Sequence, residues 1–325
     1  MVKQAHTGTL KPFNFDAIAE QIPELKLLDC DTETTSFEPP IDSSDMTPEH
    51  WVQMVHMIEL HYQSYDGFVI LHGSDTMSYS AAALSFMLEN LSKPVIFTGS
   101  QLPIGDLRTD AKENLITSIQ LAALQKKGQP LITEVGLYFE YKLYRGNRTT
   151  KINAAHFQAF NSLNYPPLAE SGVSLEVASH LLWTPKKAKF PIFHKKMDNR
   201  VGVLKLFPGI GEAFVNGVLE TKGLKALVLE TYGAGNAPTA PWFLKSLETA
   251  IENGIIVVNV TQCSGGSVLM GQYETSLALE NIQLISGKDI STEAALAKLM
   301  YMLGSGVSSA SFKTIFETSL RGEMQ

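Results

Sequence analysis

Four polar clusters in this sequence contain residue types that could carry out chemistry. They are Asp42–Met46, His72–Thr76, Tyr144–Lys151 and Thr231–Pro238. The second cluster directly follows the apolar run Gly67–Leu71 and precedes a helical stretch. Backbone amides at a helix start bind anions, and a hydroxyl beside a carboxylate, as at Ser74 and Asp75, suits acyl transfer. The same two side chains could instead simply cap the helix.

The first cluster, Asp42–Met46, precedes a helix that Thr47 and Pro48 open. Clustered hydroxyls and carboxylates can hold the ammonium and carboxylate of an amino acid, because such groups need polar partners once desolvated. An ordinary polar turn explains these residues equally well. In the third cluster, Lys151 could act as a base only if burial or neighbouring cations favour the neutral amine, and most lysines are solvated.

The fourth cluster resembles a dinucleotide-binding loop only superficially. Pro238 replaces the final glycine, and no early strand or acidic residue completes the pattern, so a tight loop is expected. The eight histidines and two cysteines show no spacing typical of metal ligands. The sequence therefore predicts neither a metal nor a cofactor.

Composition excludes several classes of partner. The net charge is -7 and the basic residues are scattered, so we expect neither nucleic acid nor an anionic membrane as partner. The apolar runs are far shorter than the roughly 20 residues that span a bilayer. Two cysteines, Cys30 and Cys263, cannot form a disulfide framework, which fits a reducing compartment. A small molecule is the expected partner.

Short apolar runs alternate with amphipathic stretches along the sequence. The runs expected as buried strands are Gly67–Leu71, Pro94–Thr98, Val135–Phe139, Val201–Leu206, Ala226–Glu230 and Ile255–Val260. The expected helices are the stretch from Pro48, Ala81–Leu91, Leu115–Leu124 and Pro241–Glu252. This alternation predicts an α/β protein with mainly parallel sheets, whose ligands lie beyond the carboxyl ends of the strands.

A stretch in which the hydrophobic periodicity weakens indicates a boundary between two domains. Between Gln158 and Lys196 the periodicity weakens before strand character resumes at Val201. We therefore expect a catalytic domain over residues 1–190, a linker over 191–200 and a second domain over 201–325.

Six segments, taken in order, resemble the type I bacterial L-asparaginases. They are Asp42–Met46, His72–Met77, Thr98–Pro103, Arg145–Lys151, Tyr232–Pro238 and Thr261–Cys263. The resemblance covers essentially the whole sequence. It implies a large, flavodoxin-like N-terminal α/β domain, a smaller C-terminal α/β domain with a parallel sheet, and a cytoplasmic homodimer or dimer of dimers. It also implies cofactor-free hydrolysis of L-asparagine to L-aspartate and ammonia.

The resemblance assigns roles to individual residues. Asp42, Ser43 and Ser44 would hold the substrate's α-carboxylate and neighbouring groups. Asp75 would bind its α-ammonium, and Gly73 belongs with these binding residues.

Further roles follow from the same resemblance. Lys151 would be the base that activates the hydroxyl of Ser74, in a site closed enough to make the ammonium form costly. Backbone groups around Ser100 would face the side-chain amide, and donors there would stabilise the oxyanion. A lid near His6–Leu10 would exclude water.

Three departures from the family pattern are visible. The family begins with an apolar strand and a Thr-Gly-Gly-Thr-Ile-Gly turn that carries its principal nucleophile, and Met1 corresponds to a point after that turn. Ser74 stands where the family usually has threonine. The hydroxyl is kept, so we expect only a modest loss of activity. Some relatives bind a second asparagine through an arginine at the position of Glu230, with residues at Thr261 and Cys263. A carboxylate there would repel that ligand, so weak or no allostery is expected.

Two other functions stay open. The protein could be a catalytically silent amino-acid binder, because Ser43, Ser44 and Asp75 could hold asparagine without a nucleophile. Alternatively, Ser74, Asp75 and Lys151 could form a self-sufficient amidase. The sequence does not set the preference for asparagine over glutamine, since one methylene changes binding by only about 1–3 kcal/mol.

Overall fold

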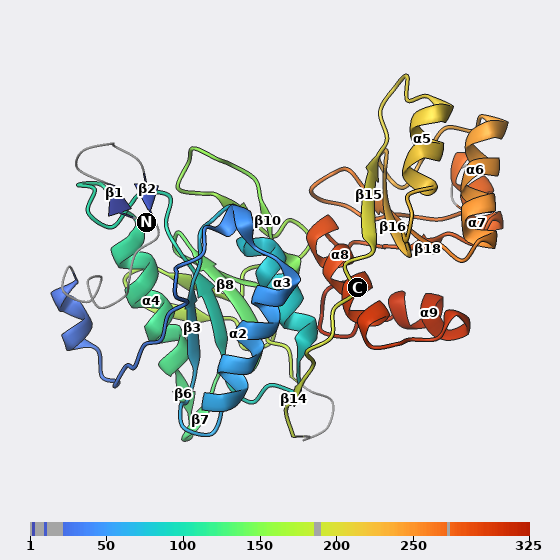
Figure 1. Cartoon of the computed structure of the whole chain (residues 1–325). Coiled ribbons are helices and arrows are strands. Elements are labelled where there is room, and N and C mark those ends of the chain that lie inside the picture. The colour runs from blue at the N-terminus through green and yellow to red at the C-terminus, as the bar shows by residue number, and fades with distance from the viewer. Residues whose placement is uncertain (1, 4–9, 12–21, 185–189, 272–273) are drawn as a thin grey trace. The chain divides into compact units, whose positions relative to one another are not determined.

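The computed structural model describes residues 2–3, 10–11, 22–184, 190–271 and 274–325. The protein divides into two compact units, Met1–Lys195 and Lys196–Gln325 (Figure 1). The division falls inside the segment expected as a linker, and the exact domain bounds stay a prediction. The expected lid at His6–Leu10 lies outside the described residues except for Leu10.

Unit 1 is built on a six-stranded sheet. In spatial order its strands are β13 (Leu175–Val177), β12 (Ala169–Ser171), β9 (Lys142–Arg145), β8 (Val135–Phe139), β5 (Val95–Thr98) and β3 (Phe68–Leu71). The three strands expected from apolar runs, β3, β5 and β8, are parallel, with Phe68 opposite Val95 and Val95 opposite Val135. Within the described residues β3 pairs with β5 alone, so it lies at the edge of the sheet.

The other half of this sheet is antiparallel, an addition to the parallel strands that the sequence predicted. β8, β9, β12 and β13 pair antiparallel with their neighbours on that side. The physical reason is the two-residue connection between β8 and β9, since so short a turn can only reverse the backbone direction. Glu140 and Tyr141 both have positive φ, as a tight hairpin turn requires.

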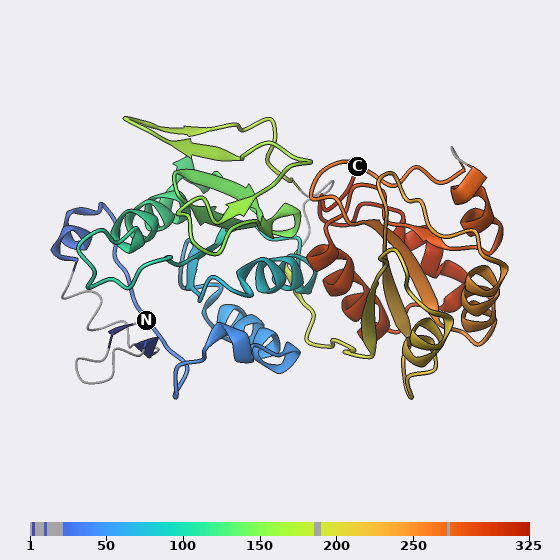
Figure 2. The ribbon, with the colours of Figure 1, turned by 90° about the horizontal axis from the view of Figure 1, so that it is seen from above.

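Within the described residues, three helices cover unit 1. They are α2 (Pro48–His61), α3 (Met77–Met87) and α4 (Ala111–Ala123). α4 packs on one face of the sheet, where Leu121 contacts the cluster around Ile96, and α3 covers the other face (Figure 2). α2 packs outside α3, so α3 is sandwiched and nearly all of its residues are buried. This double covering explains why α3 shows little amphipathic pattern and why it begins four residues before the expected Ala81.

Short elements complete unit 1. They are the antiparallel pairs β1 (Val2–Lys3) with β2 (Leu10–Lys11), β4 (Leu88–Glu89) with β14 (Ile192–Phe193), β6 (Gln125–Lys126) with β7 (Gln129–Pro130) and β10 (Thr150–Lys151) with β11 (Phe160–Asn161), and the 3-10 turns η1 (Pro23–Leu27), η2 (Ser43–Asp45) and η3 (Gly146–Arg148). The β10–β11 ribbon packs on the β8–β9 hairpin through an edge-to-face contact of Phe160 with Phe139, 5.0 Å between ring centres. This contact fixes the ribbon that carries Lys151.

Unit 2 contains the parallel sheet expected of the C-terminal domain. Its strands, in order, are β15 (Val201–Lys205), β16 (Ala226–Thr231), β17 (Ile256–Thr261) and β18 (Ile285–Ser286). Its helices are α5 (Glu212–Leu219), α6 (Pro241–Glu252), α7 (Glu274–Asn281), α8 (Thr292–Gly304) and α9 (Ser309–Phe316). The segment after β16 is the expected tight loop: Gly233 and Gly235 have positive φ, and Tyr232 donates its amide to the Asn236 carbonyl at 2.9 Å.

A fully buried ion pair anchors the C-terminus of unit 2. Lys298 and Glu323 are both inaccessible to solvent and contact each other. The Lys298 ammonium also donates to the carbonyls of Phe316 at 2.6 Å and Thr318 at 2.7 Å. Burial lowers the pKa of Lys298, and the nearby Glu323 opposes that shift. All three ammonium hydrogens therefore have acceptors, which a buried charge requires.

Candidate active site

Two loops meet because their strands are parallel neighbours. The amide of His72, just after β3, donates to the carbonyl of Thr98 at the end of β5, with a distance of 2.8 Å. The loops approach so closely that a Cβ on Gly99 would lie 2.2 Å from the His72 carbonyl oxygen. The segments His72–Thr76 and Gly99–Gln101 therefore lie side by side beyond the carboxyl ends of the strands, where ligands of such sheets bind.

Lys151 joins this edge from the β10–β11 ribbon. Its Nζ lies 2.9 Å from Ser74 Oγ and 2.6 Å from Asp75 Oδ1. The Lys151 side chain is 18% exposed, whereas that of Asp75 is 66% exposed. The adjacent hydroxyl and carboxylate of Ser74 and Asp75 thus form one cluster with Lys151, which is distant in the sequence, and the carboxylate keeps an open side toward solvent.

The capping alternative for this cluster is wrong. The N-cap of α3 is Thr76, and no side chain accepts a capping hydrogen bond there. Thr76 Oγ1 instead donates to the carbonyl of Ser43 at 2.6 Å. Ser74 and Asp75 are therefore left to interact with Lys151.

Ser43 is held against the same loop. It is buried, and a Cβ on Gly73 would lie 2.5 Å from Ser43 Oγ, so only glycine fits there. Asp42 and Ser44 behave differently, because the Asp42 carboxylate accepts from the amide and hydroxyl of Ser44 at 3.0 and 2.8 Å. These two bonds lower the pKa of Asp42. Ser43 thus joins the cluster, and Asp42 and Ser44 are hydrogen-bonded to each other in the adjoining turn.

Gln101 is a member of the cluster that the sequence did not single out. Its Oε1 accepts from Ser74 Oγ at 3.1 Å, and its Nε2 donates to the His156 carbonyl at 2.9 Å. The backbone N–H of Gln101 donates to both carboxylate oxygens of Asp110, at 3.1 and 3.0 Å. The preceding Ser100 is half-buried on the same loop. The one sequence signal for Gln101 is its place within the segment Thr98–Pro103. Its contacts with Ser74 and His156 are distant in sequence and could not be predicted.

Arg145, in the basic segment before Lys151, has a structural role. This residue is 4% exposed, and its Nε donates to Glu134 Oε2 at 2.6 Å. Its Nη2 donates to the Leu181 carbonyl at 2.7 Å, and its guanidinium lies 4.4 Å from the centre of the Tyr165 ring. Burial raises the pKa of Glu134, and Arg145 opposes that shift. Arg145 therefore supports the segment that leads to Lys151 and does not face a substrate.

The three residues named for allostery lie in unit 2. Glu230 Oε1 accepts from Thr292 Oγ1 at 2.6 Å, and its Oε2 lies 3.6 Å from Lys205 Nζ. Thr261, on the adjacent strand β17, accepts the amide of Cys263 at 3.1 Å. Both oxygens of the Glu230 carboxylate thus have partners within unit 2.

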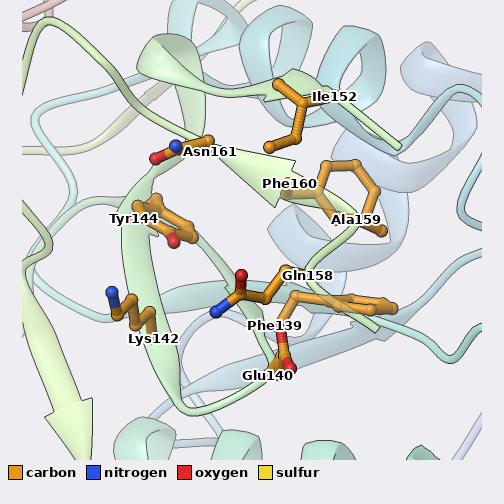
Figure 3. A pocket seen from close by; sticks show the side chains of 9 residues that line it. All are labelled: Phe139, Glu140, Lys142, Tyr144, Ile152, Gln158, Ala159, Phe160 and Asn161. Atoms are coloured by element: carbon orange, nitrogen blue, oxygen red, sulfur yellow. The ribbon is translucent and has the colours of Figure 1, made fainter. Parts of the chain in front are cut away.

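A hollow elsewhere in unit 1 is separate from this cluster. It has a volume of about 100 Å³ and lies between the β8–β9 hairpin and the β10–β11 ribbon (Figure 3). Its lining includes Glu140, Lys142, Tyr144 and Gln158. None of the residues expected to bind substrate lines it.

Neither a metal cluster nor a membrane-spanning helix is found among the described residues. No three or more metal-ligating side chains gather within those ranges. No helix in that part of the protein is long and apolar enough to cross a membrane.

Comparisons with known protein families give matches over both units. The family described as "Asparaginase, N-terminal" matches residues 1–183. The family described as "Glutaminase/Asparaginase C-terminal domain" matches residues 200–316.

Curated relatives agree. The sequence is 46% identical over 291 residues to L-asparaginase 1 of Escherichia coli K12, covering 89% of this protein and 83% of that one. It is also 46% identical over 288 residues to the 60 kDa lysophospholipase of Mus musculus, covering 88% of this protein. The match spans only 50% of the length of that mouse protein.

Solved structures share the fold. L-asparaginase I from Vibrio cholerae superimposes with a TM-score of 0.90 at 42% identity, covering 98% of this protein and 95% of that one. The thermostable L-asparaginase from Thermococcus kodakarensis gives a TM-score of 0.89 at 30% identity, covering 99% and 95%.

Proposed function

This chain belongs to the asparaginase family, and on that premise we propose that it hydrolyses L-asparagine to L-aspartate and ammonia. The reaction breaks the terminal amide C–N bond of asparagine, adds the oxygen of water to the carbonyl carbon and releases the nitrogen as ammonia. The observation that carries the proposal is the position of Lys151 Nζ, 2.9 Å from Ser74 Oγ and 2.6 Å from Asp75 Oδ1.

Each member of the cluster has a proposed role. Lys151 accepts the proton of the Ser74 hydroxyl, and the 2.9 Å distance lies within the reach of a general base. Asp75 accepts the α-ammonium of asparagine on its solvent-exposed side. A substrate ammonium there competes with Lys151 for the carboxylate.

The remaining substrate contacts are assigned to the two loops around Ser74. Asp42, Ser43 and Ser44 hold the α-carboxylate of the substrate and its neighbouring groups, and Gly73 lies against Ser43. Backbone groups near Ser100 face the amide, with Gln101 beside them. The hydrogen bond that Gln101 Oε1 accepts from Ser74 Oγ supports this placement of the Ser100 loop beside the reacting hydroxyl.

We also propose that the protein works without a cofactor, in the cytoplasm, as a homodimer or dimer of dimers. The likeness to L-asparaginase 1 and L-asparaginase I supports these assignments. Size-exclusion chromatography with light scattering would test the oligomeric state.

A coupled ammonia assay tests the function. The protein and its variants are assayed side by side with asparagine as the substrate. Lys151→Met should lower kcat at least about 100-fold, because general base catalysis typically contributes that much or more. Lys142→Met is the matched control, since Lys142 lies on the adjacent hairpin and should leave kcat unchanged.

The same assay separates the alternatives. Calorimetric binding of asparagine without release of ammonia would favour the silent binder and overturn the proposal. Ser74→Ala with full activity would exclude the self-sufficient amidase.

A further inference from the structure

His72 connects the candidate site to the interior of unit 1. Its ring is 7% exposed, and its Nδ1 lies 2.7 Å from the carbonyl oxygen of Gly73. Its Nε2 lies 2.9 Å from Ser80 Oγ on α3. Ser80 in turn accepts from Trp51 Nε1 on α2 at 2.8 Å. A continuous buried series of hydrogen bonds thus runs from α2 through α3 to the peptide that precedes Ser74.

The chemistry of each group fixes the direction of these bonds. A carbonyl oxygen only accepts, so the Nδ1 of His72 must carry the hydrogen. Burial lowers the pKa of His72 to about 4, so the ring is neutral near pH 7 and Nε2 is an acceptor. Ser80 therefore donates to Nε2 while it accepts from Trp51. Every donor and acceptor in the series has a partner, which locks the ring in a single tautomer.

Resting on the function proposed above, we propose that His72 is a positioning residue that sets the orientation of the Gly73–Ser74 peptide. Gly73 sits against Ser43 Oγ with no room for a side chain, so a rotation of this peptide would move both binding and reacting groups. Ser74 Oγ must also stay within reach of Lys151 Nζ. A misplacement of about 1 Å at such a site can cost on the order of 100-fold in rate.

Two substitutions separate this role from general support of the fold. In His72→Asn the amide nitrogen takes the place of Nδ1 and can still donate to Gly73. In His72→Gln the longer side chain reaches the place of Nε2 and Ser80, but it provides no donor to Gly73. Both variants lose packing against Phe97, whose ring lies 5.8 Å from that of His72.

The expected result is a split between the two variants in kcat. His72→Asn should keep kcat within about threefold of the wild type, and His72→Gln should lower it by about tenfold or more. Trp51→Phe is the control, because it removes only the far end of the series and should leave kcat unchanged. Equal kcat loss in both His72 variants, or a loss that only follows the melting temperature, would overturn the proposal.

Crystal structures of the variants give a readout that does not need activity. The distance from Lys151 Nζ to Ser74 Oγ should stay near 2.9 Å in His72→Asn and exceed hydrogen-bond distance in His72→Gln. An unchanged distance in His72→Gln refutes the positioning role even if the wild type releases no ammonia, an outcome that would refute only the proposed function. If His72→Gln does not fold, His72→Leu also removes the donor to Gly73 and should lower kcat and lengthen the same distance.

Discussion

Acid should destabilise unit 1 through His72, and the size of the effect follows from its burial. The ordinary histidine pKa is 6.5, whereas burial lowers that of His72 to about 4 despite the favourable bond to Gly73. Between these two values the unfolded protein binds more protons at this position than the folded protein. The free energy of unfolding therefore rises with pH across this window and falls as the pH drops from about 6.5 toward 4.

The magnitude follows from the difference of about 2.5 pKa units. At roughly 1.4 kcal/mol per unit, full protonation costs about 3 kcal/mol of stability. At pH 5, where the folded ring is still mostly neutral, about 2 kcal/mol is already lost relative to pH 7.5. Such a loss is a large fraction of the roughly 5–15 kcal/mol that typically separates folded from unfolded domains.

Urea unfolding of the wild type and of His72→Asn at pH 5, 6 and 7.5 would measure this contribution. Other titrating groups act on both proteins, so they cancel in the difference between them. The free energy of unfolding of the wild type minus that of the variant should decrease by about 2 kcal/mol from pH 7.5 to pH 5. A difference that stays constant across this range would mean that His72 is not a buried neutral histidine.

Three further outcomes are expected. Gly99→Ala should destabilise the fold by about 1–3 kcal/mol in thermal unfolding, because its Cβ would clash with backbone, whereas Gly105→Ala, with open space around it, should not. Asparagine saturation should be hyperbolic in steady-state kinetics, since the Glu230 carboxylate is already engaged; a sigmoidal curve would contradict this. Lys298→Met should lower the free energy of unfolding by about 3–5 kcal/mol in urea, because it leaves the Glu323 charge buried without its partner.

Sequence reasoning identified those elements whose burial is continuous. β5 and β8 are buried along their whole length, and their apolar runs were visible as strands. β12 and β13 were missed because three-residue strands that are partly exposed leave no measurable periodicity. The parallel order also could not be extended past β8, since a hairpin turn without glycine at Glu140 and Tyr141 gives no clear sequence signal.

The sequence predicted which residues form the candidate site, but it did not predict the contacts between them. Ser74, Asp75 and Lys151 could be named from motif order, yet spacing alone could not distinguish a helix cap from a reacting group. Gln101 was missed because its bond to Ser74 spans 27 positions in the sequence. Arg145 looked like part of a polar cluster, and only its contact with the buried Glu134 reveals a structural role.

Strand β3 shares its ladder with one neighbour within the described residues. The amides of Phe68 and His72 are bonded on the β5 side, so those of Val69 and Leu71, which alternate with them, face the other way. The loop that begins at His72 continues directly from this strand, so any displacement of β3 would also move Ser74.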